Sequence, residues 1–340
     1  MQLQHFTYPG TADADGVSPV IHGDLYTPDP GQEIRAVVQF VHGMDEHFGR
    51  YRELARALCA EGIVLAGEDH RGHGRSVPEG GVFGSFSAAG SGWTLVLSDL
   101  YRLRGMLRRR FPGVPFFLLG HSMGSFLVRS MLLRGEEPPA DGVILSGTAY
   151  HEAAMLEAGR ELCRAVIARS GRETPMTAVM DASGVLYNLR FHPVKTEYDW
   201  VSGDPETVQA HIDDPYCGHT PTAGLFDDMI GGLLAVCAGS VLSSPPESRK
   251  RKKEEPHIPV LFISGAKDPV GDYGTGVKKT AAVFRYQGYR DVTVLLYPEA
   301  RHEVLLDRCR EITTQDILAW ITRHLTKSSG TDSSFEKGKV

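Results

Sequence analysis

One stretch of the sequence, residues 115–133 (PFFLLGHSMGSFLVRSMLL), constrains the fold more than any other. Its apolar run at 116–119 has the length of a buried strand, and its later apolar residues lie on one face of a helix. Between them stands GHSMG at 120–124, a G-x-S-x-G pattern, which in this setting is typical of a nucleophile elbow that exposes the Oγ of Ser122. We expect glycine at 120 and 124 because strand and helix approach too closely there for a Cβ. An ordinary Gly/Ser-rich turn between strand and helix could have the same sequence. The rest of the chain therefore has to distinguish a nucleophile elbow from such a turn.

The flanking sequence alternates between strand and helix patterns. Residues 18–27 predict a strand of an early hairpin, and 35–41 (RAVVQFV) predict a strand buried on both faces of a parallel sheet. A helical pattern at 51–59 and a short strand at 63–66 follow, and then a long helix at 93–111 and another strand at 142–145. This rhythm indicates an α/β fold with a mostly parallel central sheet flanked by helices.

Composition narrows the class of protein. The 340 residues are 41% apolar and 23% charged, which is typical of a globular chain, and the net charge of −6 gives no case for a nucleic-acid partner. The first residues lack a signal-peptide pattern, and no apolar run approaches the roughly 18 residues of a membrane span. The five cysteines are scattered without a C-x-x-C, so neither a disulfide framework nor a zinc site is predicted. These features favour a cytoplasmic protein.

The alternation stops after about residue 150 and resumes only at 259–264 (PVLFIS). Because this interval far exceeds a normal connection, we expect an inserted helical cap at about 150–222, followed by a helix at 223–242 that returns the chain to the sheet. The basic run at 249–253 is predicted to be an exposed loop rather than a localisation signal. One domain should span 1–326, and the polar tail at 327–340 should be disordered.

Two later strand ends supply what a serine nucleophile requires. A serine hydroxyl needs a base, and the base needs an orienting carboxylate. Strand 259–264 leads to Asp268, and strand 291–297 leads to His302. Since the carboxyl ends of parallel strands share one edge of the sheet, Ser122, Asp268 and His302 should meet there.

With these motifs the chain resembles the α/β-hydrolase superfamily, specifically the monoacylglycerol lipase and lysophospholipase group, also described as serine aminopeptidase-like. The matching segments span roughly residues 20–325, and they are HGM with EH at 42–47, DHRGHG at 69–74, GHSMG at 120–124, GAKD at 265–268 and RHE at 301–303. The resemblance implies that Ser122 is the nucleophile, His302 the general base and acid, and Asp268 the orienting carboxylate. It also implies an oxyanion hole formed by the backbone N–H groups of Met44 and Met123.

Other residues compete for these roles. Asp272 is an alternative acid near Asp268, and His121 lies beside the serine, although neighbours on a tight elbow point apart. His257 precedes its strand and should lie at the opposite edge of the sheet, and His42 is expected to brace the oxyanion loop. His70 and His73 lack a third metal ligand and are predicted to belong to a structural turn.

The resemblance implies hydrolysis of a small carboxylic ester through an acyl-enzyme, without a metal or organic cofactor, and it allows peripheral contact of the cap with a lipid surface. An apolar acyl chain is favoured because the cap offers apolar side chains for a pocket, namely Met155, Leu156, Val166, Ile167, Met180, Leu186 and Leu189. An aminopeptidase of the proline iminopeptidase type would instead need an acidic cluster, for which Glu152, Glu157, Glu161, Asp213 and Asp214 are candidates. A catalytically silent binding protein is the third alternative, and the sequence says nothing about oligomeric state.

Overall fold

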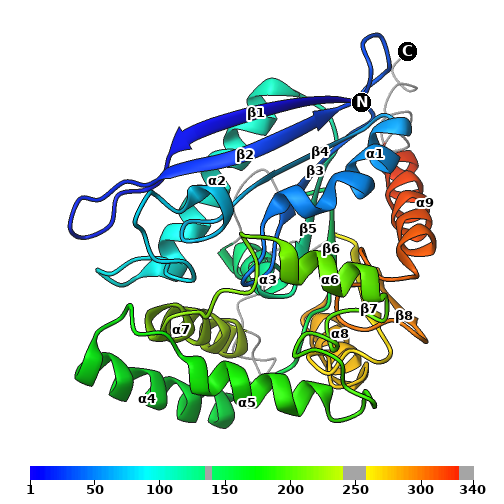
Figure 1. Ribbon diagram of the computed structural model, residues 1–340. Helices are drawn as coiled ribbons and strands as arrows, with labels where there is room; N and C mark the ends of the chain where they lie inside the picture. Colours follow the sequence, from blue (N-terminus) through cyan, green and yellow to red (C-terminus); the bar gives the residue numbers. More distant parts are fainter. Residues whose placement is uncertain (135–139, 240–257, 329–340) are drawn as a thin grey trace, which may run out of the picture.

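A computed structural model describes residues 1–134, 140–239 and 258–328. Its centre is an eight-stranded sheet in the order β1-β2-β4-β3-β5-β6-β7-β8 (Figure 1). The two N-terminal strands are antiparallel to their neighbours, and every other pairing is parallel. The strands are β1 (Gln2–Pro9), β2 (Val20–Thr27), β3 (Ala36–Val41), β4 (Ile63–Glu68), β5 (Phe116–His121), β6 (Gly142–Ser146), β7 (Val260–Gly265) and β8 (Val292–Tyr297). The mostly parallel sheet predicted from the sequence is confirmed.

Helices cover both faces of the sheet and form two cores. On one face α1 (Arg52–Ala60) and α9 (Arg310–Ser328) pack against the sheet, with Leu58 and Ile321 fully buried. On the other face lie α2 (Gly92–Arg110), α3 (Met123–Arg134) and α8 (Thr275–Tyr286). Strands β3 to β7 are buried along their whole length, as continuous apolar runs require in a parallel sheet covered on both sides.

Among the described residues between β6 and β7, the chain forms four helices. They are α4 (Ala153–Ser170), α5 (Thr177–Asn188), α6 (Pro205–Asp213) and α7 (Ala223–Gly239). In Figure 1, α4, α5 and α7 lie together below the sheet, and α7 packs between α4 and α3. The predicted return helix at 223–242 therefore exists as α7, which also joins the core beside α3.

Several predictions fall partly or wholly outside the described residues. These are the loop containing the basic run at 249–253, His257, and the tail beyond 328; α9 includes residues 327 and 328, which the sequence had placed in that tail. Two short 3-10 helices, η1 (Phe48–Tyr51) and η2 (Gly74–Ser76), complete the order of elements. In the ranges that the structure describes, we find no helix with the length and apolarity needed to cross a bilayer.

Candidate active site

Ser122 stands on a sharp turn between β5 and α3. Its φ of 51° lies in the left-handed region, which a residue with a side chain rarely adopts. A Cβ on Gly120 would come within 2.5 Å of the Gly124 carbonyl oxygen, and a Cβ on Gly124 would overlap the Val41 carbonyl. Glycine at both positions therefore lets the helix start directly against the strands, as the G-x-S-x-G spacing predicted.

Asp268 and His302 form a buried pair at the neighbouring strand ends. His302 Nδ1 lies 3.1 Å from both carboxylate oxygens of Asp268. The carboxylate also accepts hydrogen bonds from the Val270 N–H at 2.9 Å and from the Ser264 hydroxyl at 3.2 Å, which fix its orientation. Burial by itself would lower the pKa of His302, but the charge of Asp268 and its hydrogen bond outweigh burial and raise that pKa above 6.5.

The serine and the His–Asp pair belong to the same edge of the sheet. The ring of His302 lies 4.9 Å from that of His121, the residue before Ser122, and 5.3 Å from that of Trp200. Among the described residues Ser122 Oγ and His302 Nε2 make no hydrogen bond to each other, and such bonds commonly tighten only when substrate binds. The structure thus brings the three predicted residues to one edge of the sheet, after the ends of β5, β7 and β8.

The competing residues have other partners. The imidazole Nδ1 of His121 lies 3.2 Å from Ser146 Oγ, and burial lowers the pKa of His121 to about 3. Asp272 lies on the turn that precedes α8, whereas the carboxylate that contacts His302 is that of Asp268. Burial likewise lowers the pKa of His70 to about 4 and that of His73 to about 3, so both imidazoles are neutral groups in a packed turn.

The loop after β3 presents the backbone of Met44. The preceding Gly43 N–H donates to Glu46 Oε1 at 2.5 Å, and the His42 ring spans from the Gly43 carbonyl to the His70 N–H. Neither the Met44 N–H nor the Met123 N–H donates to any residue that the structure describes. Both residues line the same cavity as Ser122, so two N–H groups are available beside the serine.

Arg50 joins this loop to the loop of His302. Its guanidinium binds Glu303 through two hydrogen bonds of 2.5 and 2.8 Å and Glu46 through a third of 3.0 Å. All three side chains are buried, and Tyr51 donates a further hydrogen bond to Glu46 at 2.7 Å. The beginning of the candidate oxyanion loop and the residue after His302 are therefore held by one cation.

A cavity of about 450 Å³ opens over Ser122. Its wall near the serine includes Trp200, which also contacts His302, and Val270, whose N–H fixes Asp268. The lining is mainly apolar or aromatic, and its larger members are Met44, Met123, Phe126, Leu156, Met180, Tyr187, Tyr198, Trp200, Phe226, Met229, Ile230, Leu233 and Val270.

The predicted pocket lining is correct only in part. Leu156 and Met180 line the cavity, but Met155, Leu186 and Leu189 are exposed, and Val166 and Ile167 pack against the core. The sequence interpretation missed one wall, which α7 provides through Phe226, Met229, Ile230 and Leu233. Their spacing of i, i+3, i+4 and i+7 marks one face of a helix, and this signal was present in the sequence.

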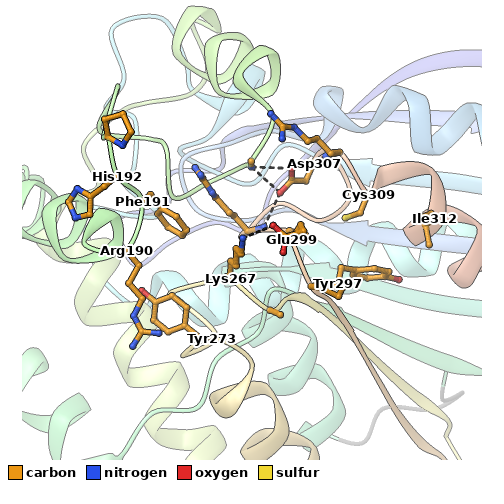
Figure 2. A pocket seen from close by; sticks show the side chains of 17 residues that line it. Arg190, Phe191, His192, Lys267, Tyr273, Tyr297, Glu299, Asp307, Cys309 and Ile312 are labelled. Atoms are coloured by element: carbon orange, nitrogen blue, oxygen red, sulfur yellow. Dashed lines mark hydrogen bonds and ion pairs between the residues drawn. The ribbon is translucent and has the colours of Figure 1, made fainter.

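A second cavity, of about 760 Å³, is lined by Lys267 and by residues 297–301, which precede Asp268 and His302 in the chain (Figure 2). It is larger, but none of the three predicted catalytic residues lines it. Several of its charged side chains already have partners: Lys267 pairs with Glu299 at 2.5 Å, Arg190 lies 3.8 Å from the ring centre of Tyr273, and Asp307 accepts backbone N–H groups. Chemistry rather than size therefore identifies the cavity over Ser122 as the candidate active site.

Comparison with known proteins places the chain in a family. The family described as serine aminopeptidase, S33, matches residues 32–309, so the chain belongs to it and is an α/β-hydrolase. A monoacylglycerol lipase of Mycolicibacterium smegmatis is 29% identical over 89% of this chain and 92% of its own length. The monoglyceride lipase of Homo sapiens is 26% identical over 88% of this chain and 86% of its own length. Among solved structures, a thermostable carboxyl esterase from Bacillus coagulans in complex with glycerol aligns with a TM-score of 0.81 at 26% identity, over 96% of this chain and 99% of that chain.

Proposed function

We propose that this protein is a serine carboxylic ester hydrolase that acts on monoacylglycerols or similar single-chain esters. The observation that carries the proposal is the position of Ser122, on a strained turn at the base of a mainly apolar cavity of about 450 Å³. The similarity to monoacylglycerol lipases and to a carboxyl esterase over most of the chain supports the same reaction class.

In the proposed mechanism Ser122 Oγ attacks the ester carbonyl while His302 Nε2 accepts its proton. Asp268 holds the imidazole by Nδ1 and stabilises the imidazolium that forms. The N–H groups of Met44 and Met123 would bind the oxyanion, an interaction worth about 3–4 kcal/mol per donor. His302 then protonates the leaving alcohol, and the same residue activates the water that releases the acid from Ser122.

The cavity favours an acyl chain over a cationic amine. None of the acids offered from the sequence for an aminopeptidase lines it: Asp214 pairs with His47, and Glu161 pairs with Arg164 on the surface. Carboxylates of Asp45, Asp181 and Glu197 do lie in the wall. However, Asp45 is engaged by the His219 N–H, and burial raises the pKa of Asp45 well above its usual range, which favours its neutral form.

A substrate panel tests this function. Wild-type protein should hydrolyse monoacylglycerols and p-nitrophenyl esters, with weaker turnover of lysophospholipids and of aminoacyl anilides. Ser122→Ala should abolish the hydrolysis while circular dichroism and the melting temperature stay close to wild type. Turnover of the anilides in preference to every ester would establish the aminopeptidase, and a folded wild-type protein without any turnover would establish a silent binding protein.

We also propose that the outer surface of α4 and α5 contacts a lipid surface from which the substrate is taken. Six exposed apolar side chains lie on these helices and on the segment after them, and they are Met155, Leu162, Val185, Leu186, Leu189 and Val194. Single exposed apolar residues are ordinary, but Val185, Leu189 and Val194 line one hollow, and this grouping supports a binding surface. A cytoplasmic location remains a prediction.

A further inference from the structure

Three side chains of types that bind metals meet beside the cavity. His47 comes from the loop after β3, and Asp214 and Cys217 come from the segment between α6 and α7 (Figure 1 shows these elements). One donor atom from each lies within 4.8 Å of the others, and in the ranges the structure describes no other trio of His, Cys, Asp or Glu side chains is so arranged. The sequence predicted no zinc site, because its cysteines are scattered without a C-x-x-C. His47 and Asp214 are 167 residues apart, so no local motif joins them.

The local backbone already orients these donors toward one another. Asp214 Oδ1 accepts the Tyr216 N–H at 2.9 Å, which leaves Oδ2 pointing at His47 Nε2, 2.9 Å away. The Cys217 N–H closes a turn on the Asp214 carbonyl at 3.0 Å. The thiol of Cys217 is buried, yet no hydrogen bond links it to any residue in the described ranges. The cluster thus holds a buried sulfur with no polar partner beside an oriented imidazole and carboxylate.

This donor set suits zinc. Zn²⁺ binds imidazole nitrogen, carboxylate oxygen and thiolate sulfur in tetrahedral geometry, where ligand atoms lie roughly 3.4–3.8 Å apart. All three donor atoms lie within 4.8 Å of one another, so the sulfur needs only a small inward movement, while the 2.9 Å separation of His47 Nε2 and Asp214 Oδ2 widens slightly. The side chains of His47 and Asp214 are 13% and 24% exposed, so an ion can enter from solvent and keep water as a fourth ligand.

We propose that His47, Asp214 and Cys217 bind one Zn²⁺ ion and thereby fasten the loop of Met44 to the cap segment. On binding, Cys217 loses its thiol proton to solvent, and His47 carries its proton on Nδ1 so that Nε2 can ligate. Residues close to two of the ligands in the sequence line the cavity: Met44 and Asp45 precede His47, and Gly218 and His219 follow Cys217. Two contacts already join these segments, a 2.5 Å hydrogen bond from the His219 N–H to Asp45 and the 2.9 Å contact of His47 with Asp214, and the ion would replace the second with metal bonds that include Cys217.

Metal titration of the full-length, chelator-treated and reduced protein tests the site. Wild type should bind one Zn²⁺ per chain in competition with a chromophoric chelator, and bound Co²⁺ should give a thiolate-to-cobalt charge-transfer band. Cys217→Ser should remove this band, and Asp214→Asn should weaken binding by more than about 100-fold, since even outer partners of a ligand contribute about 10- to 100-fold. Cys309→Ser, which alters another partly buried cysteine, is the matched control and should retain both signals.

The absorption spectrum of Co²⁺-loaded wild type tests whether a thiolate binds the metal, even where a variant folds poorly. A Co²⁺ complex without a sulfur band, or Zn²⁺ affinity that is equal in wild type and in a folded Cys217→Ser protein, would overturn the assignment. Since the readouts are metal binding and absorbance, they do not depend on ester hydrolysis.

Discussion

The backbone of Ser122 is strained at the candidate active site. A φ of 51° at a non-glycine position costs on the order of 1–3 kcal/mol, and it persists only where the surroundings enforce it. Here the Ser122 N–H is tied to the Ser146 carbonyl at 2.9 Å, and Gly124 packs directly against the strand that ends at Val41. The rest of the fold therefore maintains the exposure of Oγ.

Replacement of Asp268 tests the electrostatic role of the buried pair. Asp268→Asn keeps the size of the side chain but removes the charge that raises the pKa of His302, so kcat should fall by about 10⁴-fold. Because the base must be neutral, wild-type kcat/KM should rise with pH through a midpoint above 6.5, and residual activity of the variant should rise through a lower midpoint. A pH–rate profile of both proteins measures the shift. Asp272→Asn is the matched control, and an equal loss of activity in both variants would contradict the assignment of the acid.

At the scale of elements, strand ends explain why the candidate site was predictable. Ser122, Asp268 and His302 each follow a strand in chain order, so local sequence patterns sufficed to place them on one edge. The cavity wall was less predictable, because an apolar helix face in the cap can point to the core, to the cavity or to solvent. Leu156 and Leu162 on α4 illustrate this: the first lines the cavity and the second is exposed. Tertiary packing alone decides between these outcomes.

Arg50 links the loop of Met44 to the loop of His302, so its replacement should affect both stability and catalysis. Arg50→Lys keeps a positive charge but cannot reproduce the two-pronged bond to Glu303 together with the bond to Glu46. We expect a loss of about 1.5–3 kcal/mol in the free energy of unfolding, as for hydrogen bonds to charged groups, and a lower kcat as the two loops lose alignment. Urea unfolding and steady-state kinetics measure the two effects. Arg52→Lys, on the exposed side of α1, should change neither, and a wild-type kcat in Arg50→Lys would refute the alignment role.

At the scale of the molecule, the mostly parallel sheet and the flanking helices α1, α2 and α3 followed from the sequence, because periodicity and segment length report burial directly, whereas α8 and α9 were not predicted. The Arg50 link and the His47–Asp214–Cys217 cluster did not follow. Each joins segments distant along the chain, with Arg50 and Glu303 separated by 253 residues, and no local pattern records such a meeting.

If the exposed apolar side chains of α4 and α5 contact lipid, their replacement should weaken binding of the protein to vesicles. Leu186, which is 60% exposed, should insert into an interface and contribute about 1.5–3 kcal/mol. Leu186→Glu should therefore lower affinity for neutral phosphatidylcholine vesicles by about tenfold or more, measured by co-sedimentation. Val17→Glu places the same charge on an equally exposed apolar position in the loop between β1 and β2 and is the control. Equal vesicle binding by wild type and both variants would argue against this surface.

Covalent labelling of the folded protein by a fluorophosphonate, followed by peptide mass spectrometry, tests the role of Ser122 most directly. The reagent phosphonylates a serine only when a base and an oxyanion site activate it. We expect one adduct per chain, located on Ser122 and absent from Ser122→Ala and from denatured wild type. The adduct should be retained in the control Ser98→Ala, which alters a serine on α2 whose hydroxyl donates to the Thr94 carbonyl. An adduct on another residue, or none on a folded protein that hydrolyses esters, would contradict the assignment of Ser122 as the nucleophile.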